Sequence, residues 1–118
     1  MDSHSIVAEK SFSFAIRIVK LYQYLCNEKK EYVLSKQLLR SGTSIGANIQ
    51  EGLNAQSKRD FLMKMNISLK EASETNYWLR LLTATEILDE KESKSILEDC
   101  TELLKILTSI VKTTASKV

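Results

Sequence analysis

The sequence predicts an all-α fold, an antiparallel up-down-up-down four-helix bundle that forms one domain over residues 1–118. The chain contains no proline and only three glycines, a composition typical of helical proteins. Apolar residues recur at helical spacing in four segments, and the connections between the segments are short and polar. Helices joined by such short loops pack as antiparallel neighbours. We expect the helices at about residues 5–28, 35–53, 58–88 and 90–114.

The first helix has one apolar face and one charged face. The apolar face is formed by Val7, Phe14, Ile18, Leu21, Tyr22 and Leu25. Val19, Ala8 and Cys26 widen it, and Phe12 lies just past them. Lys10, Arg17 and Lys20 occupy the other side. This pattern predicts an amphipathic bundle helix with a solvated basic face.

The segment LSKQLLRSGTSIGANIQEG predicts a second helix that another backbone approaches closely. Leu34, Leu38, Ile45 and Ile49 share an arc of roughly 60° on a helical wheel. All three glycines of the chain are in this helix, where each costs about 0.5–1 kcal/mol relative to alanine. Close helix packing is the natural compensation. Ser35 is the expected N-cap residue.

A polar strip follows one flank of this helix. Its members are Gln37, Arg40, Ser44, Asn48 and Glu51. Neighbouring members are three or four residues apart and can hydrogen-bond along the helix. Arg40 and Glu51 are ~16 Å apart and need other partners. We expect Arg40 to pair with Glu74 of the third helix, which would fix helix register more than it adds stability, so replacing Arg40 should disturb assembly or stability.

The third helix is predicted to be the longest, with Ser57 and Asp60 resembling a capping box at its start. Its main apolar stripe consists of Phe61, Leu62, Met65, Leu69, Ala72, Leu79 and Ile87. Asn76 falls within this stripe and should have a hydrogen-bond partner. A second strip, of Met63, Ile67, Trp78 and Leu81, lies nearly opposite. It predicts a contact with another subunit; the alternative is that the first helix covers it.

The fourth helix begins after Asp89, the expected N-cap, with Glu92 in its first turn. One broad apolar stripe follows, made of Ile96, Leu97, Cys100, Leu103, Leu104, Leu107, Ile110 and Val111. Lys112 and Lys117 suit the negative end of the helix dipole. We therefore expect this helix to complete the bundle core.

Charge and composition limit the classes of function. The formal net charge of +2 argues against a protein built mainly to coat nucleic acid, although it allows a local basic patch. Two cysteines in a helical chain favour a reducing cytoplasm. The N-terminal sequence MDSHSIVAEK lacks the features of a signal peptide. No segment approaches ~18 uninterrupted apolar residues, so we expect no membrane association.

The sequence contains no recognisable catalytic set. His4 is the single histidine, and Cys26 and Cys100 each fall on an apolar face, where burial is expected. The carboxylates of Glu51, Glu71 and Glu74 resemble a bundle metal site, but the histidines that such sites use are missing. We predict no catalytic residue, no cofactor and no metal.

Five basic residues near the predicted loops form a candidate nucleic-acid contact. They are Lys29, Lys30, Lys36, Lys58 and Arg59. In a ring of subunits, each modest patch would be repeated by symmetry and could act through multivalency. The alternative is ordinary solvated charge. Few exposed aromatic residues for base stacking are evident, so binding would be electrostatic and salt-sensitive.

The motifs RSGTSIGANIQEG and SETNYWLRLL closely resemble the 23S rRNA intervening-sequence protein family, a bacterial four-helix-bundle family. The resemblance covers nearly the whole chain and fades in the fourth helix. The matching positions are Gln37, Arg40, Ser41, Ser44, Ile45, Asn48, Ile49, Glu51, Gly52, Phe61, Glu74, Trp78 and Leu79. The resemblance implies a cytoplasmic bundle and a ring-like pentamer. The family that it resembles also includes a branch, the accessory variability determinant of diversity-generating retroelements. Members of that branch are basic, bind nucleic acid and assist a reverse transcriptase. This nearly neutral chain departs from that branch.

Together these observations predict a non-enzymatic, homo-oligomeric, pentameric scaffold or adaptor whose first partner is itself. The alternative is an accessory protein that binds nucleic acid and acts with RNA or a reverse transcriptase complex. An enzyme is the third possibility, which the lack of a catalytic set disfavours.

Overall fold

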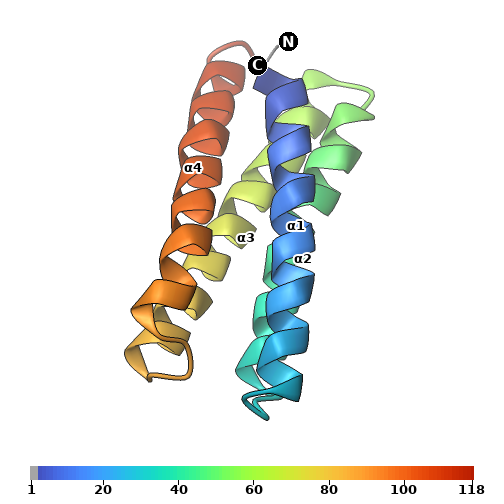
Figure 1. Ribbon diagram of the computed structural model, residues 1–118. Helices are drawn as coiled ribbons and strands as arrows, with labels where there is room; N and C mark the ends of the chain where they lie inside the picture. The colour runs from blue at the N-terminus through green and yellow to red at the C-terminus, as the bar shows by residue number, and fades with distance from the viewer. Residues whose placement is uncertain (1–2) are drawn as a thin grey trace.

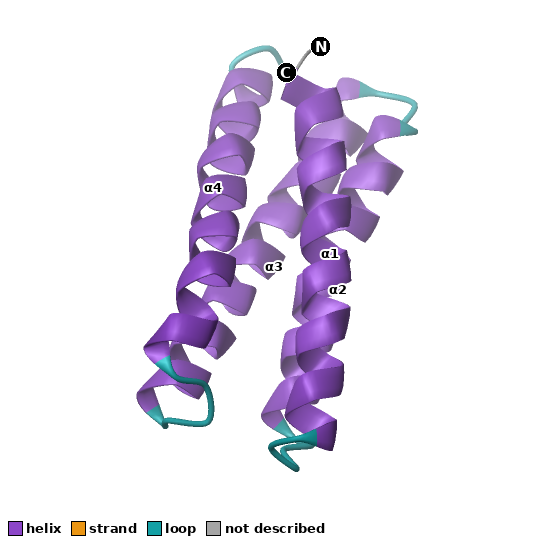
Figure 2. Cartoon of the chain, viewed as in Figure 1, coloured by secondary structure: helices purple, strands orange, loops and turns teal. Residues whose placement is uncertain are grey.

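The computed structural model describes residues 3–118 and consists of four α-helices joined by short loops. They are α1 (Ser3–Asn27), α2 (Leu34–Leu53), α3 (Lys58–Ala84) and α4 (Glu90–Ala115). Each helix packs antiparallel on the next, and α1 closes the bundle through a smaller contact with α4 (Figure 1). Both chain ends lie at the same end of the bundle, and no strand occurs in residues 3–118 (Figure 2). The predicted all-α bundle is confirmed.

All four helices contribute to one apolar core. The largest fully buried side chains are Phe14, Ile18, Leu25, Leu38, Ile45, Ile49, Met65, Leu79, Leu82, Leu88, Leu103 and Leu107. On α3 the buried positions alternate three and four residues apart, the spacing of a helix packed lengthwise against its neighbours. They are Met65, Ser68, Ala72, Thr75, Leu79 and Leu82. Two of the six are hydroxyl residues that an apolar pattern does not reveal.

The glycines of α2 mark places where neighbouring helices come close. At Gly46 the neighbours include backbone atoms, as the sequence predicted, whereas at Gly42 and Gly52 they are side-chain atoms. A Cβ atom at Gly42 would lie 2.8 Å from Cγ1 and Cγ2 of Ile18. At Gly46 it would lie 3.4 Å from the backbone oxygen of Ser11, and at Gly52 2.9 Å from Cε of Met65. The energetic cost of glycine in α2 is therefore offset by tight packing of α1 and α3 against it.

The predicted N-cap of α2 is wrong, because Glu31 satisfies this helix end instead. Its carboxylate accepts from the backbone N–H groups of Val33, Leu34 and Ser35 at 2.7–3.1 Å. Ser35 is buried, and its hydroxyl donates to the Glu31 carbonyl oxygen at 2.8 Å. Burial, the largest single influence, raises the pKa of Glu31, but the three N–H donors together lower it below its usual value.

Replacing Glu31 with glutamine is expected to destabilise the bundle by about 1 kcal/mol at neutral pH, as loss of a helix cap does. Because the folded-state pKa is lowered, the contribution of Glu31 is present above the unfolded pKa and is lost as pH falls through the folded pKa. Thermal melts at pH 7 and at acidic pH test this: the difference between wild type and Glu31→Gln should shrink with acid. Glu28→Gln, an exposed carboxylate in the same loop, should melt like wild type at both.

The ends of α3 and α4 follow local hydrogen bonding. Ser57 accepts from the Asp60 N–H at 3.1 Å, as predicted. The predicted extension of α3 to residue 88 is wrong, because Glu86 adopts a left-handed conformation with φ of 64°. The N–H groups of Ile87 and Leu88 then both donate to the carbonyl oxygen of Leu82, which turns the chain and buries Leu88. Asp89 and Glu92 form a full capping box at the start of α4.

A polar seam joins α1 to α4. Arg17 contacts Asp99 at 2.6 Å and Lys10 contacts Glu102 at 3.0 Å. The Tyr24 hydroxyl donates to Glu92 at 2.6 Å. The expected solvated basic face of α1 therefore needs correction. Lys20 is exposed, whereas Lys10 and Arg17 pair with acidic residues of α4.

Candidate functional site

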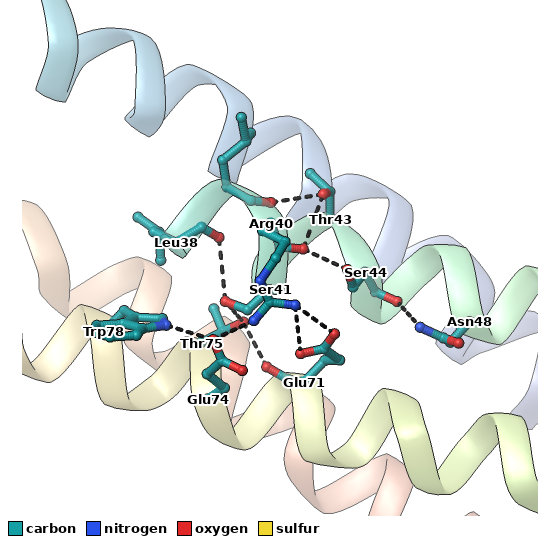
Figure 3. Close-up of polar contacts among 11 residues, drawn as sticks. Leu38, Arg40, Ser41, Thr43, Ser44, Asn48, Glu71, Glu74, Thr75 and Trp78 are labelled. Atoms are coloured by element: carbon teal, nitrogen blue, oxygen red, sulfur yellow. Dashed lines mark hydrogen bonds and ion pairs between the residues drawn. The ribbon is translucent and has the colours of Figure 1, made fainter. Parts of the chain in front are cut away.

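The polar strip is organised around Arg40, which bridges two carboxylates of α3 (Figure 3). Its Nη1 donates to Glu71 Oε2 at 3.0 Å, and its Nη2 donates to Glu74 Oε2. The indole N–H of Trp78 donates to the same Glu74 oxygen at 2.9 Å. The predicted pair of Arg40 with Glu74 is confirmed, and Glu71 is a second partner that sequence reasoning did not assign to it. These contacts lock α2 to α3 in one register.

Arg40 and Glu74 each favour the charged form of the other. Hydrogen bonds to Glu74 and then Glu71 raise the pKa of Arg40. Hydrogen bonds from Arg40, and after it from Trp78, hold the pKa of Glu74 below its usual value. The Glu71 side chain is only 17% exposed, against 34% for Glu74 and 49% for Arg40. The guanidinium thus shields two carboxylates from each other at the edge of the core.

Buried hydroxyl groups line the same helix pair beneath the ion pairs. Thr75 Oγ1 lies 2.9 Å from Ser41 Oγ and 2.8 Å from the carbonyl oxygen of Glu71 (Figure 3). The Ser68 hydroxyl donates to the carbonyl oxygen of Ile45 at 2.8 Å, from α3 to α2. These three side chains are fully buried. Their small size lets the two helices approach, and their hydrogen bonds satisfy the burial of polar atoms.

The rest of the polar strip bonds along α2 or across to α3. Ser44 donates to the carbonyl oxygen of Arg40 at 2.6 Å, and Asn48 donates to that of Ser44 at 2.8 Å. Glu51 pairs with Lys64 of α3 at 2.7 Å, and Gln37 is exposed. The expected partner of Asn76 exists: its Oδ1 accepts from Arg80 Nε at 2.9 Å.

The second apolar strip of α3 is only partly covered. Met63 is 51% exposed and Ile67 is also exposed, whereas Trp78 and Leu81 are half-buried. Tyr77, which sequence analysis did not include, is 49% exposed beside Trp78, with the two rings in edge contact. The helical spacing of Tyr77 from Met63 was the signal that could have found it. A single copy therefore leaves Met63, Ile67 and Tyr77 exposed, whereas Trp78 packs against the core.

A second uncovered apolar surface lies on α1, and sequence analysis did not single it out. Phe12 is 69% exposed, and Ile16 and Val19 are exposed on the same flank. Ala8 and Ala15 continue this flank toward α2, where Ala47 is also exposed. The spacing of Phe12, Ile16 and Val19, at steps of four and three residues, was the available signal.

The five candidate nucleic-acid contacts fall at opposite ends of the bundle. Lys29, Lys30 and Lys36 surround the α1–α2 loop, whereas Lys58 and Arg59 follow the α2–α3 loop (Figure 1). Lys29 also lies 5.8 Å from the centre of the Tyr24 ring. The structure therefore places three of the five at one end of the bundle and the other two at the opposite end.

The remaining candidates for chemistry carry no assembled site in the described part of the chain. Cys100 is buried, and burial raises the pKa of its thiol to about 12; Cys26 is half-buried near Ser35. The His4 ring lies against that of Phe61 in a tilted arrangement, with the ring centres 4.9 Å apart. In residues 3–118 no cluster of three or more His, Cys, Asp or Glu is placed to hold a metal ion. None of the described helices could cross a bilayer.

Comparison with known proteins identifies relatives of this chain. A solved structure from Bacteroides thetaiotaomicron VPI-5482, described as a protein with unknown function from the S23 ribosomal protein family, is 56% identical to it. The two structures agree with a TM-score of 0.92, and the match covers 94% of this chain and 99% of the other. A search of the curated proteins finds no match.

The family assignment rests on a match along most of the sequence. The family model described as 23S rRNA-intervening sequence protein matches residues 3–109. This range includes the polar strip and both uncovered apolar surfaces, and it confirms the resemblance inferred from the motifs of α2 and α3. The chain belongs to the 23S rRNA-intervening sequence protein family.

Proposed function

We propose that this protein is a non-enzymatic scaffold or adaptor of the cytoplasm that works as a ring-like homopentamer. The observation that carries the proposal is the exposure of large apolar side chains on two helices of a single copy, with Phe12 69% and Met63 51% exposed. Apolar patches of this kind mark interaction surfaces. Methionine and aromatic residues are also enriched in the centres of protein interfaces.

The polar groups support a structural role. Arg40, around which the strip is organised, forms ion pairs with Glu71 and Glu74 of the same copy. Hydroxyl groups such as Thr75 and Ser68 are buried and bonded to neighbouring helix atoms. Groups used in this way hold helices together. They are not arranged as a nucleophile with a neighbouring base.

Mass measurement in solution tests the proposal. Light scattering coupled to size exclusion should give about five times the 13.4 kDa of one chain, with the same value across a tenfold dilution from tens of micromolar. A mass of one chain throughout that range would overturn the proposal. A stable assembly of another size would retain the scaffold role and refute the pentamer.

A second candidate function, nucleic-acid binding, is favoured by the α1–α2 end of the bundle. Tyr32 is 52% exposed there, between Lys30 and Lys36 in the chain, and Lys29 is also exposed. Sequence analysis expected few exposed aromatic residues for base stacking, and Tyr32 supplies one beside these cations. Cations beside an exposed ring suit a single strand, whose phosphates and bases they contact respectively. A ring of parallel copies would repeat this patch around one rim.

Fluorescence anisotropy with labelled single-stranded DNA and RNA tests this second function. Affinity should fall at least tenfold between about 50 and 200 mM salt, because the phosphate contacts release counterions. Tyr32→Ala should weaken binding roughly tenfold through loss of stacking. Lys58→Glu, at the far end of the bundle, serves as the control and should bind like wild type. Absence of binding at about 50 mM salt would refute this function.

A further inference from the structure

We propose that the polar seam between α1 and α4 is an electrostatic latch, whose opening releases α4 while α1, α2 and α3 remain packed together. The seam joins Lys10, Arg17 and Tyr24 of α1 to Glu102, Asp99 and Glu92 of α4, respectively. None of these side chains belongs to either uncovered apolar surface, so the latch does not require the proposed homo-oligomer. The signal that opens the latch is screening or loss of its charges.

The seam is a row of polar contacts along one edge of α1. Lys10, Arg17 and Tyr24 follow one another at steps of seven residues, which is close to two helical turns, so their side chains leave the same face of the helix. Arg17 Nη1 donates to Ser95 Oγ at 3.1 Å as well as to Asp99. The side chains of the two ion pairs are between 40% and 52% exposed. Dissolved ions therefore reach these pairs and weaken them.

The seam lies on the side of the bundle with the smallest contact between neighbouring helices. A groove of about 230 Å³ lies between α1 and α4 there, and it is lined by Lys10 and Asp99 together with Phe14 and Leu103. Phe14 and Leu103 are among the fully buried side chains of the core. The charged groups of the seam therefore stand directly beside the core, and they hold α4 to α1 where the helix contact is smallest.

The other three helices are joined by contacts that lie inside the bundle. Between α2 and α3, the buried hydroxyl groups of Ser68 and Thr75 hydrogen-bond to α2. Between α1 and α2, buried Ile18 packs so closely on Gly42 that no Cβ atom fits. A hydrogen bond from the Cys100 thiol of α4 to α3 is weak, because a thiol is a poor donor. Since proteins open first at their least stable unit, α4 is the helix that we expect to separate from the others.

Cys100 provides a probe of this opening, because it lies on α4 and is fully buried. Burial raises the pKa of its thiol to about 12, so a thiol reagent reacts with it only after it becomes exposed. In a Cys26→Ser background, the labelling rate relative to that of the denatured chain measures the population of the open state. The matched reporter for the remaining helices is Ser68→Cys, in a chain that also carries Cys26→Ser and Cys100→Ala. Ser68 is buried between α3 and α2.

Two arginine variants separate the opening of α4 from unfolding of the whole chain. Arg17→Met breaks an ion pair of the latch and should speed labelling of Cys100 about threefold. Arg40→Met breaks the pairs between α2 and α3, which stay intact when only α4 leaves. It should therefore speed labelling of the Ser68→Cys reporter and leave that of Cys100 unchanged. Without either arginine variant, Cys100 should label roughly tenfold faster than the reporter, or more.

Salt and one conservative variant test the chemistry of the latch. Raising the salt concentration from about 0.1 to 1 M should speed labelling of Cys100, and by a smaller factor in Arg17→Met, because one screened pair is already absent. Tyr24→Phe removes only the hydroxyl that binds Glu92 and should also speed labelling. Equal labelling rates for Cys100 and the reporter, with Arg40→Met accelerating both, would show that α4 leaves only on global unfolding and would overturn the proposal. An unchanged Cys100 rate in Arg17→Met would overturn the role of the seam.

Discussion

Replacing Gly42 with valine is expected to destabilise the bundle by about 3 kcal/mol, the upper part of the range for overpacked cores. A Cβ atom at this position would already lie 2.8 Å from two atoms of Ile18, and Ile18 is fully buried. Valine adds two further carbons beyond that Cβ, so α1 and α2 must separate or Ile18 must leave its rotamer. Chemical denaturation measured by circular dichroism gives the change in unfolding free energy.

A compensating substitution sharpens this expectation. Ile18→Ala removes three carbons, the number that Gly42→Val adds, and alone it should cost about 2–5 kcal/mol because it leaves a cavity. The double variant conserves volume and should be more stable than the sum of the two losses predicts, by roughly 2 kcal/mol. Strictly additive losses would show that the two positions do not pack against each other. Gly46→Ala, where the nearest side-chain atom is 3.3 Å away, should have a much smaller effect.

The helix assignments show which parts of the fold an apolar pattern can predict. On α1 the predicted positions Val7, Phe14, Ile18 and Leu25 are all buried. On α3 the pattern was misleading, because Ser68 and Thr75 occupy core positions and bond to backbone oxygens. A search for the periodicity of apolar residues does not detect a serine or threonine that is buried together with its hydrogen-bond acceptor. The spacing of seven residues through Met65, Ala72 and Leu79 was the remaining clue.

Sequence analysis could predict an ion pair of the candidate site where few residues were available as partners. Arg40 and Glu51 could not pair with each other, and the predicted partner of Arg40, Glu74 on α3, is the one observed. The partner of Glu51 was left open by the sequence, and the structure places Lys64 of α3 there. Glu71 was not predicted because α3 places it one turn from Glu74, and the choice between them depends on how the helices are rotated. Phe12 was placed just past the apolar face of α1, but its 69% exposure was not predicted, since sequence alone does not show how far α2 covers that flank of α1.

Arg40→Met is expected to destabilise the bundle by roughly 1–3 kcal/mol at neutral pH. Removing one partner of a fully buried ion pair costs about 3–5 kcal/mol, and the exposure of this cluster reduces that figure. Without the guanidinium, Glu71 and Glu74 face each other one turn apart as unpaired carboxylates. Melting temperature and denaturant titration at pH 7 measure the loss.

The dependence of this loss on pH identifies its electrostatic origin. Hydrogen bonding to Arg40 lowers the folded-state pKa of Glu74. The resulting stabilisation is therefore present above the unfolded pKa and disappears as pH falls through the folded pKa, so the gap between wild type and Arg40→Met should close in acid. A gap that stays constant with pH would indicate lost side-chain packing instead. An unchanged melting temperature at pH 7 would remove support for the pair altogether.

Two further variants separate the Arg40 cluster from ordinary surface charge. Lys64→Met breaks the more exposed pair with Glu51 and should cost less than about 1 kcal/mol. The triple variant Arg40→Met, Glu71→Gln, Glu74→Gln removes the unpaired charges and should recover most of the stability lost by Arg40→Met, because apolar and neutral replacements of a charge cluster can be nearly neutral. If the triple variant recovers stability and also keeps the wild-type assembly mass, the cluster serves to avoid carboxylate repulsion within one copy. If stability returns without assembly, the charged groups of the strip also take part in the contact between copies.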